Sequence, residues 1–209
     1  MLKDLRLAWH RWTVRRKMDR VFGRGADPYR YSESPYEQAR LDAMEKALAG
    51  RRYPRVLEVG AAEGHFTRRL AAVSDAVTAL ELSPVAAARA RAAVSGQPVT
   101  LIESDVRVWD AAGAVFDAVV LGEVLYYLDK PLVQPEFEEA LVRMGGWVAP
   151  GGRLLLAHGF ADAAERARRV HYRERFEAGG FRLVSEGVVS KRDRDITPSC
   201  LVSLLERPA

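Results

Sequence analysis

The apolar positions from residue 54 onward alternate between the period of a strand and that of a helix. Short runs rich in Val, Leu and Ile predict strands at residues 55–60, 76–82, 99–103, 116–121, 153–158, 181–186 and 200–206. Stretches with helical spacing predict helices at residues 65–73, 84–94, 134–147 and 161–178. This alternation is typical of an α/β fold in which crossover helices cover a largely parallel sheet.

One further helix is predicted just before the first strand. Ser34 and Pro35 are typical of a helix start, because serine caps free N–H groups and proline fits the first turn. We expect this helix to span residues 35–48.

The N-terminus predicts another helix with a distinct apolar face. Leu2, Leu5, Trp9 and Trp12 recur at steps of three and four, with arginines on the other faces. Three interpretations remain open. The helix packs its tryptophans on the domain as a lid, it binds a membrane surface or a partner, or it is an arm for nucleic acid.

The charge of the chain is concentrated in this segment. The net charge is +4, but residues 1–24 hold eight basic and two acidic side chains, so the remainder carries −2. A slightly acidic body offers no broad field for phosphates, and a nucleic-acid partner is therefore not favoured. We expect a basic helix and loop at residues 1–34, followed by one domain at residues 35–209.

Length and composition narrow the class of protein. A chain of 209 residues can form one full core and a short appendage. The apolar run at residues 116–128 is interrupted by Asp117 and Glu123, so no bilayer span is expected. The single cysteine, Cys200, and a start without a secretory leader predict a cytoplasmic protein.

A strand that leads into a turn of small residues is the first chemical signal. Residues 56–64 read Val-Leu-Glu-Val-Gly-Ala-Ala-Glu-Gly. Gly60 permits a sharp turn, and Gly64 lies where the N–H groups of a helix start can hold an anionic or polar group. The segment lacks the spacing of pyrophosphate binders and the Gly-Lys-Ser/Thr end of nucleotide hydrolases, so neither a dinucleotide nor a triphosphate is favoured.

Acidic residues end the next two predicted strands. Glu81 follows Gly60 by 21 residues and can accept hydrogen bonds from both hydroxyls of a ribose. Asp105 can accept from an adenine amino group while Val106 packs on the ring. Because parallel strands end at the same edge of a sheet, the three strand ends predict a nucleoside site.

These motifs together resemble the class I S-adenosylmethionine-dependent methyltransferases. Further matching pieces are Ala-Leu-Glu-Leu-Ser-Pro at 79–84, Glu-Ser-Asp-Val at 103–106 and Val-Ala-Pro-Gly-Gly-Arg-Leu at 148–154. Residues 27–40 (Asp-Pro-Tyr-Arg-Tyr-Ser-Glu-Ser-Pro-Tyr-Glu-Gln-Ala-Arg) and 121–129 (Leu-Gly-Glu-Val-Leu-Tyr-Tyr-Leu-Asp) resemble, more narrowly, the NodS-like group. The resemblance covers about residues 35–207. It implies a single-domain, Rossmann-like, seven-stranded sheet that is mostly parallel with an antiparallel last strand, helices on both faces and, here, an N-terminal helical extension.

The resemblance also implies the cofactor, S-adenosyl-L-methionine, and its product, S-adenosyl-L-homocysteine. Together with the strand ends it assigns cofactor contacts to a set of eleven residues: Tyr36, Glu58, Gly60, Ala61, Ala62, Gly64, Glu81, Leu82, Asp105, Val106 and Gly122. The resemblance also places Tyr29, Tyr31, Tyr36, Glu37 and Arg40 where the family covers its cofactor, as a lid. For Tyr29 and Tyr31 the preferred alternative is that they are loop aromatics packed on the surface. No residue is assigned to a metal.

Candidate catalytic groups follow the fourth and fifth predicted strands. An alkyl amine has a pKa near ~10 and must reach the methyl group as the free base. His158, at the end of the fifth strand, is the first candidate for the general base. Glu123 and Tyr126 lie where class I enzymes place groups that face the methyl, and His171 on the next helix is a further candidate.

The sequence therefore predicts S-adenosylmethionine-dependent methylation of a small molecule, with an amine on a sugar-containing or other polar metabolite as the preferred acceptor. The alternatives are O-methylation of a natural product, methylation of RNA or protein with the basic helix for docking, and cofactor binding without catalysis. Monomer and homodimer both remain open.

Overall fold

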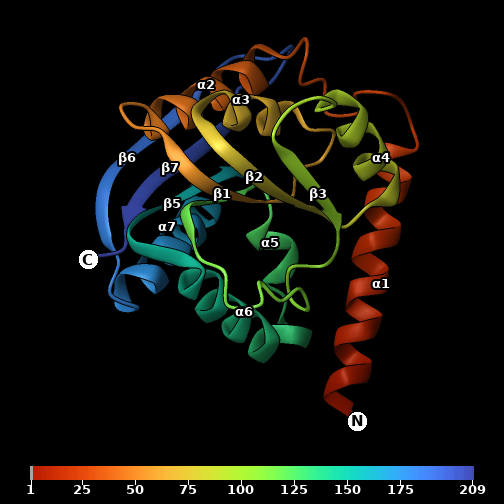
Figure 1. The fold of residues 1–209 in the computed structure, drawn as a ribbon. Coiled ribbons are helices and arrows are strands. Elements are labelled where there is room, and N and C mark those ends of the chain that lie inside the picture. The colour runs from red at the N-terminus through yellow and green to blue at the C-terminus, as the bar shows by residue number, and fades with distance from the viewer. Residues whose placement is uncertain (1) are drawn as a thin grey trace.

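The computed structural model describes residues 2–209 as a central sheet with helices on both faces (Figure 1). The strands are β1 (Tyr53–Val59), β2 (Ser74–Glu81), β3 (Val99–Glu103), β4 (Phe116–Gly122), β5 (Val148–Phe160), β6 (Arg182–Ser190) and β7 (Ser199–Glu206). They lie in the order β3-β2-β1-β4-β5-β7-β6. Strands β1 to β5 pair in parallel, and β7 runs antiparallel to both β5 and β6. The predicted Rossmann-like fold is confirmed.

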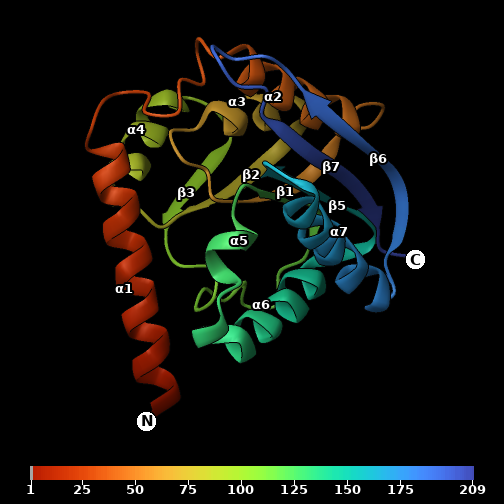
Figure 2. The same cartoon turned by 180° about the vertical axis from the view of Figure 1, so that it is seen from behind.

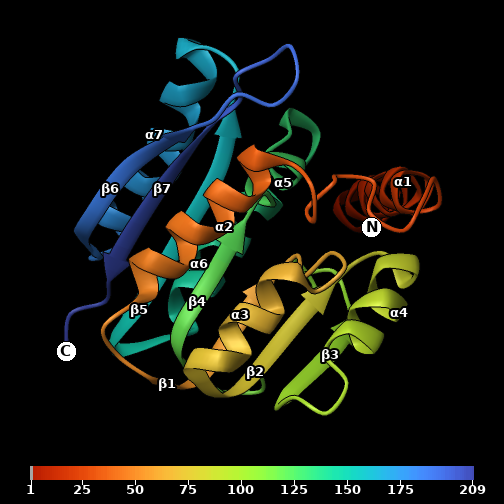
Figure 3. The ribbon, with the colours of Figure 1, turned by 90° about the horizontal axis from the view of Figure 1, so that it is seen from above.

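The helices are α1 (Leu2–Phe22), α2 (Pro35–Leu48), α3 (His65–Val73), α4 (Pro84–Ala93), α5 (Leu125–Leu128), α6 (Gln134–Gly146) and α7 (Ala163–Ala178), with a 3₁₀ turn, η1 (Pro131–Val133), before α6. Figure 3 shows α2 and α3 on one face of the sheet and α6 and α7 on the other. Among these described helices, none combines the length and apolar character that crossing a bilayer requires.

The two faces of the sheet hold two apolar cores. Residues 118–121 of β4 are at most 1% exposed, as the uninterrupted apolar run predicts for a strand covered on both sides. One core joins this strand to α6 and α7 and includes Phe137 and Phe176. The other joins it to α2 and α3 and includes Met44 and Leu70.

Local signals set the ends of several elements. Ser34 accepts a hydrogen bond from the backbone N–H of Glu37, and Pro35 occupies the first turn of α2, as predicted. The bounds of α2, α3 and β3 match the expected ranges. The short helix α5 and the turn η1 were not predicted.

The first of the three interpretations of the N-terminal helix, that its tryptophans pack on the domain, is wrong. Leu5, Trp9 and Trp12 are 61%, 58% and 53% exposed. The opposite side of the helix faces the body, where it buries His10, Met18 and Phe22. Figures 1 and 2 show α1 along one edge of the molecule, with α4 next to its C-terminal end. The apolar stripe that the sequence displays most clearly therefore points to solvent.

A glycine between β1 and α3 permits α3 and α4 to approach closely. Gly64 has φ +83°, and a Cβ at this position would lie 3.3 Å from the Cα of Ala90 in α4. Gly50 has a similar φ of +91° but open space around it. An alanine at position 50 would therefore meet backbone strain alone, whereas an alanine at position 64 would meet the same strain and a clash with α4.

We expect Gly64→Ala to lower the free energy of unfolding by about 2–4 kcal/mol, because a left-handed conformation costs about 1–2 kcal/mol and the clash adds to it. Gly50→Ala, the matched control, is expected to cost only about 1–2 kcal/mol. Urea unfolding of both variants measures the difference. Equal losses would show that α4 does not constrain position 64.

Candidate functional site

A cavity opens where the strand order reverses between β1 and β4, the switch point at which open α/β sheets bind ligands. Its volume is about 1050 Å³, open space at the mouth included. The carboxyl ends of β1 and β2, the turn after β3 and the exit of β4 form the floor. Val14, Met18 and Phe22 of α1 form part of the wall. The predicted edge of the sheet is thus the edge that carries the cavity.

The turn after β1 is held in an unusual backbone conformation. Gly60 has φ +83° and Ala62 has φ +48°. The N–H groups of Gly60 and Ala61 donate to the carbonyl of Leu80 on β2 at 2.8 and 3.0 Å, which ties the turn to the neighbouring strand. Gly60 and Ala62 line the cavity, whereas Ala61 lines a smaller cavity beside it and Gly64 begins α3 behind the turn.

Glu81 places a buried carboxylate in the cavity wall. Its two oxygens accept from the backbone N–H groups of Ala62 and Ser83 at 2.8 and 2.7 Å. Burial raises the pKa of the carboxyl to about 7. The side chain lines the cavity together with Leu82. Each carboxylate oxygen can accept a further hydrogen bond, which suits a pair of neighbouring hydroxyls.

Asp105 also lines the cavity, with Val106, but its carboxylate already has a cationic partner. Both oxygens accept from the guanidinium of Arg107, at 3.0 and 2.6 Å, and Arg11 of α1 lies 3.4 Å away. Although burial opposes ionisation, the bonds and charge of Arg107 keep the pKa of Asp105 below its usual value. An adenine amino group at this position would share the carboxylate with Arg107, a competition that the sequence pattern did not reveal.

Glu58 lies beneath the turn rather than in the main cavity. It lines the smaller cavity, which shares Gly60, Gly122 and Glu123 with the larger one. Its carboxylate accepts from the hydroxyl of Thr67 at 2.6 Å, and burial raises its pKa from 4.5 to about 7. It supports the turn from below.

The raised pKa of Glu58 predicts a pH-dependent stability. The folded protein favours the protonated carboxyl, so this contribution to stability is fully present below about pH 4.5 and is lost as the pH rises through about 7. Glu58→Gln keeps an acceptor for Thr67 and removes the titration. We expect the variant to gain stability relative to the wild type between pH 5 and pH 8, by about 3 kcal/mol at most. Urea unfolding of both proteins at pH 5 and pH 8 measures this. The same stability difference between variant and wild type at the two pH values would contradict the prediction.

Glu123 and Tyr126 form a pair at the exit of β4. Oε2 of Glu123 accepts from the hydroxyl of Tyr126 at 2.6 Å, and Oε1 accepts from the backbone N–H of Gly159 at 2.7 Å. Glu123 has φ +54°, a strained value for a residue with a side chain. Burial and the neighbouring Glu123 raise the pKa of Tyr126, so its phenol stays neutral. Both side chains line the cavity, as does Gly122.

Residues of the loop after α1 and of α2 also line the cavity, as expected for a lid. Tyr29 and Tyr31, expected on the surface, line the cavity. Arg40 does so too, and its guanidinium donates to Glu37 at 2.6 Å while remaining buried. Tyr36 is buried behind this wall, outside the lining of either cavity. The pattern Tyr-Arg-Tyr in the loop was the available signal, since a solvated loop rarely needs so many aromatics.

The two candidate histidines lie outside the cavity. The ring of His158 is 2% exposed, its Nε2 accepts from the backbone N–H of Leu125 at 3.2 Å, and burial lowers its pKa to about 3. His171 lies on the exposed side of α7, beside Glu174. The geometry supports neither as a general base.

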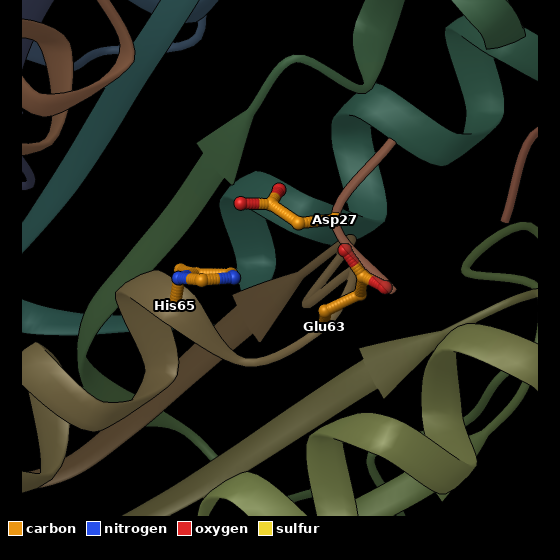
Figure 4. Close-up of side chains that lie close together, drawn as sticks. All are labelled: Asp27, Glu63 and His65. Atoms are coloured by element: carbon orange, nitrogen blue, oxygen red, sulfur yellow. The ribbon is translucent and has the colours of Figure 1, made fainter. Parts of the chain in front are cut away.

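A cluster of ionisable groups ties the loop after α1 to the turn after β1 (Figure 4). A carboxylate oxygen of Asp27, one of Glu63 and a ring nitrogen of His65 lie within 4.8 Å of one another, close enough for the three to bind one metal ion. The carboxylate of Asp27 accepts from the backbone N–H and hydroxyl of Ser32 at 2.9 and 2.6 Å, and Glu63 pairs with Arg89 at 2.6 Å. These contacts of Asp27 and Glu63 position the loop, while Oε2 of Glu63 is buried without a hydrogen-bond partner among the described residues.

Comparison with known proteins gives a family and a fold. Residues 14–162 match the model of the nodulation protein S (NodS) family. The nodulation protein S of Azorhizobium caulinodans is 41% identical over 103 residues, 49% of each chain, and that of Sinorhizobium fredii is 33% identical over 131 residues, 62% of this chain and 59% of the relative. The chain spans about half the length of the curated relatives it matches.

A solved structure shares the fold over nearly its whole length. The N-methyltransferase NodS of Bradyrhizobium japonicum, crystallised with S-adenosyl-L-homocysteine, superposes with a TM-score of 0.81 at 23% identity, over 93% of this chain and 98% of the other. Uncharacterised methyltransferases of Mycobacterium tuberculosis are 31% identical over 113 residues, 54% of each chain.

Proposed function

Because the chain belongs to the nodulation protein S family, we propose that it is an S-adenosylmethionine-dependent methyltransferase that methylates an amine of a polar small molecule. The observation that carries the proposal is the pairing, in one cavity, of a buried carboxylate at the end of β2, Glu81, with a second carboxylate at the end of β4, Glu123. The first suits the ribose of the cofactor and the second suits the acceptor.

The residues of the cavity fit the cofactor along its whole length. Glu81 would hold the ribose hydroxyls, with Leu82 and Val106 beside the adenine. Arg40, a buried cation in the wall, suits the carboxylate of the methionine end. The aromatic faces of Tyr29 and Tyr31 suit the sulfonium charge. The bound cofactor supplies an activated methyl group, and the protein supplies alignment and exclusion of water.

The exit of β4 supports an amine as the acceptor. The carboxylate of Glu123 can hold an ammonium group and take up its proton at Oε2, which accepts only from the hydroxyl of Tyr126, whereas Oε1 accepts from the N–H of Gly159 and the thiol of Cys200. The neutral Tyr126 fixes the carboxylate. The ammonium of Lys17 lies 5.0 Å from the ring centroid of Tyr127, which is also in the lining, so a cation of the protein itself already occupies this ring.

The proposal also covers the roles of the two parts of the chain, the class of the acceptor and the cellular compartment. Residues 1–34 would cover the cofactor held by the domain at residues 35–209, since α1 and the following loop supply part of the lining. The acceptor would be a small molecule rather than nucleic acid, because the body of the chain carries −2. A cytoplasmic setting is supported by Cys200, which is a buried free thiol.

The test is to incubate the purified protein with methyl-labelled S-adenosylmethionine and a cell extract that has been separated into small-metabolite, nucleic-acid and protein fractions. We expect label in an amine of the small-metabolite fraction. Label only in RNA or protein would overturn the proposed acceptor class, and label that appears as an ether or ester would favour O-methylation.

A further inference from the structure

The outward face of α1 carries an apolar stripe that no part of the described chain covers. Leu5, Trp9 and Trp12, which we call the outer stripe, follow one another at i, i+4 and i+7 and therefore share one side of the helix. Each is more than half exposed. Met18 and Phe22, which pack against the body, lie on the opposite side.

Positive charge continues the outer stripe along the helix. Arg16 and Arg20 lie one and two turns beyond Trp12 on the same side, and the guanidinium of Arg16 lies 4.7 Å from the centroid of the Trp12 ring. Asp19 is instead turned to the body, where it accepts from the hydroxyl of Ser83 at 2.6 Å. The outward side therefore combines aromatic, aliphatic and cationic groups.

Helix α1 is held against the domain by ion pairs. Three ion pairs join it to the domain, namely Lys3 to Glu139 at 2.7 Å, Arg11 to Asp105 at 3.4 Å and Arg15 to Glu103 at 2.9 Å. Figures 1, 2 and 3 all place α1 at the periphery of the molecule. With the packed side held in this way, the outer stripe remains directed away from the sheet.

The composition and charge of the outward face favour a lipid surface over a second copy of the chain or a nucleic acid as the binding partner. A second copy of the chain would bring two segments of charge +6 together, which is unfavourable. An aliphatic side chain such as Leu5 contributes little to the stacking and phosphate contacts that bind nucleic acid. Tryptophan prefers the boundary between water and lipid, and arginines beside an apolar stripe are attracted to anionic headgroups.

We propose that the outer stripe of α1, together with Arg16 and Arg20, docks the protein on an anionic lipid surface. The apolar side chains enter the boundary between headgroups and acyl chains, and the arginines remain at the headgroup level. This docking goes beyond the proposed methyl transfer and does not depend on it.

Binding of the full chain to vesicles tests the proposal. The probes are vesicles of phosphatidylcholine with about one third phosphatidylglycerol, and vesicles of phosphatidylcholine alone, at the same salt concentration. We expect the partition coefficient, measured by centrifugation, to be about tenfold or more higher on the anionic vesicles. Trp9→Ser/Trp12→Ser should lower it about tenfold or more, because two interfacial side chains are lost.

A matched control removes exposed apolar side chains elsewhere. Val142 on α6 and Ile196 in the loop before β7 are 78% and 66% exposed. Val142→Ser/Ile196→Ser should change the partition coefficient less than about twofold, since neither side chain belongs to the outer stripe. Arg16→Gln/Arg20→Gln should weaken binding to anionic vesicles only, and added salt should reduce this charge-dependent part.

Fluorescence gives a second readout. Trp147 is buried and Trp109 packs against the same core, so quenching by brominated phosphatidylglycerol would report mainly Trp9 and Trp12. Equal partition on neutral and anionic vesicles, or unchanged partition of Trp9→Ser/Trp12→Ser, would overturn the proposal. Absence of vesicle binding would overturn it too, and a dimer that this variant dissociates, or binding of a single-stranded oligouridylate, would then identify the occupant.

Discussion

Glu81→Ala is expected to raise the dissociation constant for S-adenosylmethionine and S-adenosylhomocysteine at least about 100-fold. Hydrogen bonds to a charged group contribute about 1.5–3 kcal/mol each, and two ribose hydroxyls would lose such a partner. The variant also releases the N–H groups of Ala62 and Ser83, which the carboxylate now holds in place. Isothermal titration measures the change directly.

Two variants make this result specific. Glu81→Gln keeps the volume and one acceptor oxygen, so an intermediate loss of about tenfold is expected. Asp75→Ala removes an exposed acid from the other end of β2, where Asp75 pairs with Arg52, and should leave the affinity unchanged. Wild-type affinity in a folded Glu81→Ala protein would show that the ribose is held elsewhere.

Glu123→Gln is expected to lower kcat about 100-fold or more while changing the affinity for S-adenosylhomocysteine less than about threefold. The amide retains an acceptor for the N–H of Gly159 but carries no charge, so it cannot stabilise an ammonium or take up its proton. The acceptor found by the labelling experiment serves as the substrate. Steady-state rates across a range of pH separate the loss of a base from a loss of binding.

Tyr126→Phe is the control for this prediction. It removes the hydroxyl that donates to Glu123 but leaves the carboxylate and its bond to Gly159, so a decrease in kcat of less than about tenfold is expected. A kcat of Glu123→Gln close to that of the wild type would remove Glu123 from the reaction. Equal decreases in kcat in both variants would instead indicate that the hydrogen bond between Glu123 and Tyr126 only positions other groups and that the charge of Glu123 is not used.

Local signals in the sequence predicted the sheet and the floor of the cavity. Strand β3, helix α2 and the glycine turn are each set by neighbouring residues, through apolar runs, a serine cap and φ values that favour glycine. Glu81 could be placed because the end of a parallel strand fixes the edge at which its last side chain lies.

Tertiary choices could not be predicted in the same way. Helix α1 has apolar side chains on two opposite sides, and the sequence cannot tell which side packs. Met18 and Phe22 pack, whereas Trp9 and Trp12 do not. His158 has a typical position for a catalytic group, but a contact 33 residues away in sequence, with the N–H of Leu125, occupies one of its ring nitrogens.

The position of the bound cofactor product can be measured in a crystal structure of the protein grown with S-adenosyl-L-homocysteine. We expect the ligand in the cavity at the switch point, with its ribose hydroxyls within hydrogen-bond distance of Glu81 and its sulfur on the side formed by Glu123 and Tyr126. A ligand bound outside this cavity, or a ribose turned away from Glu81, would contradict it.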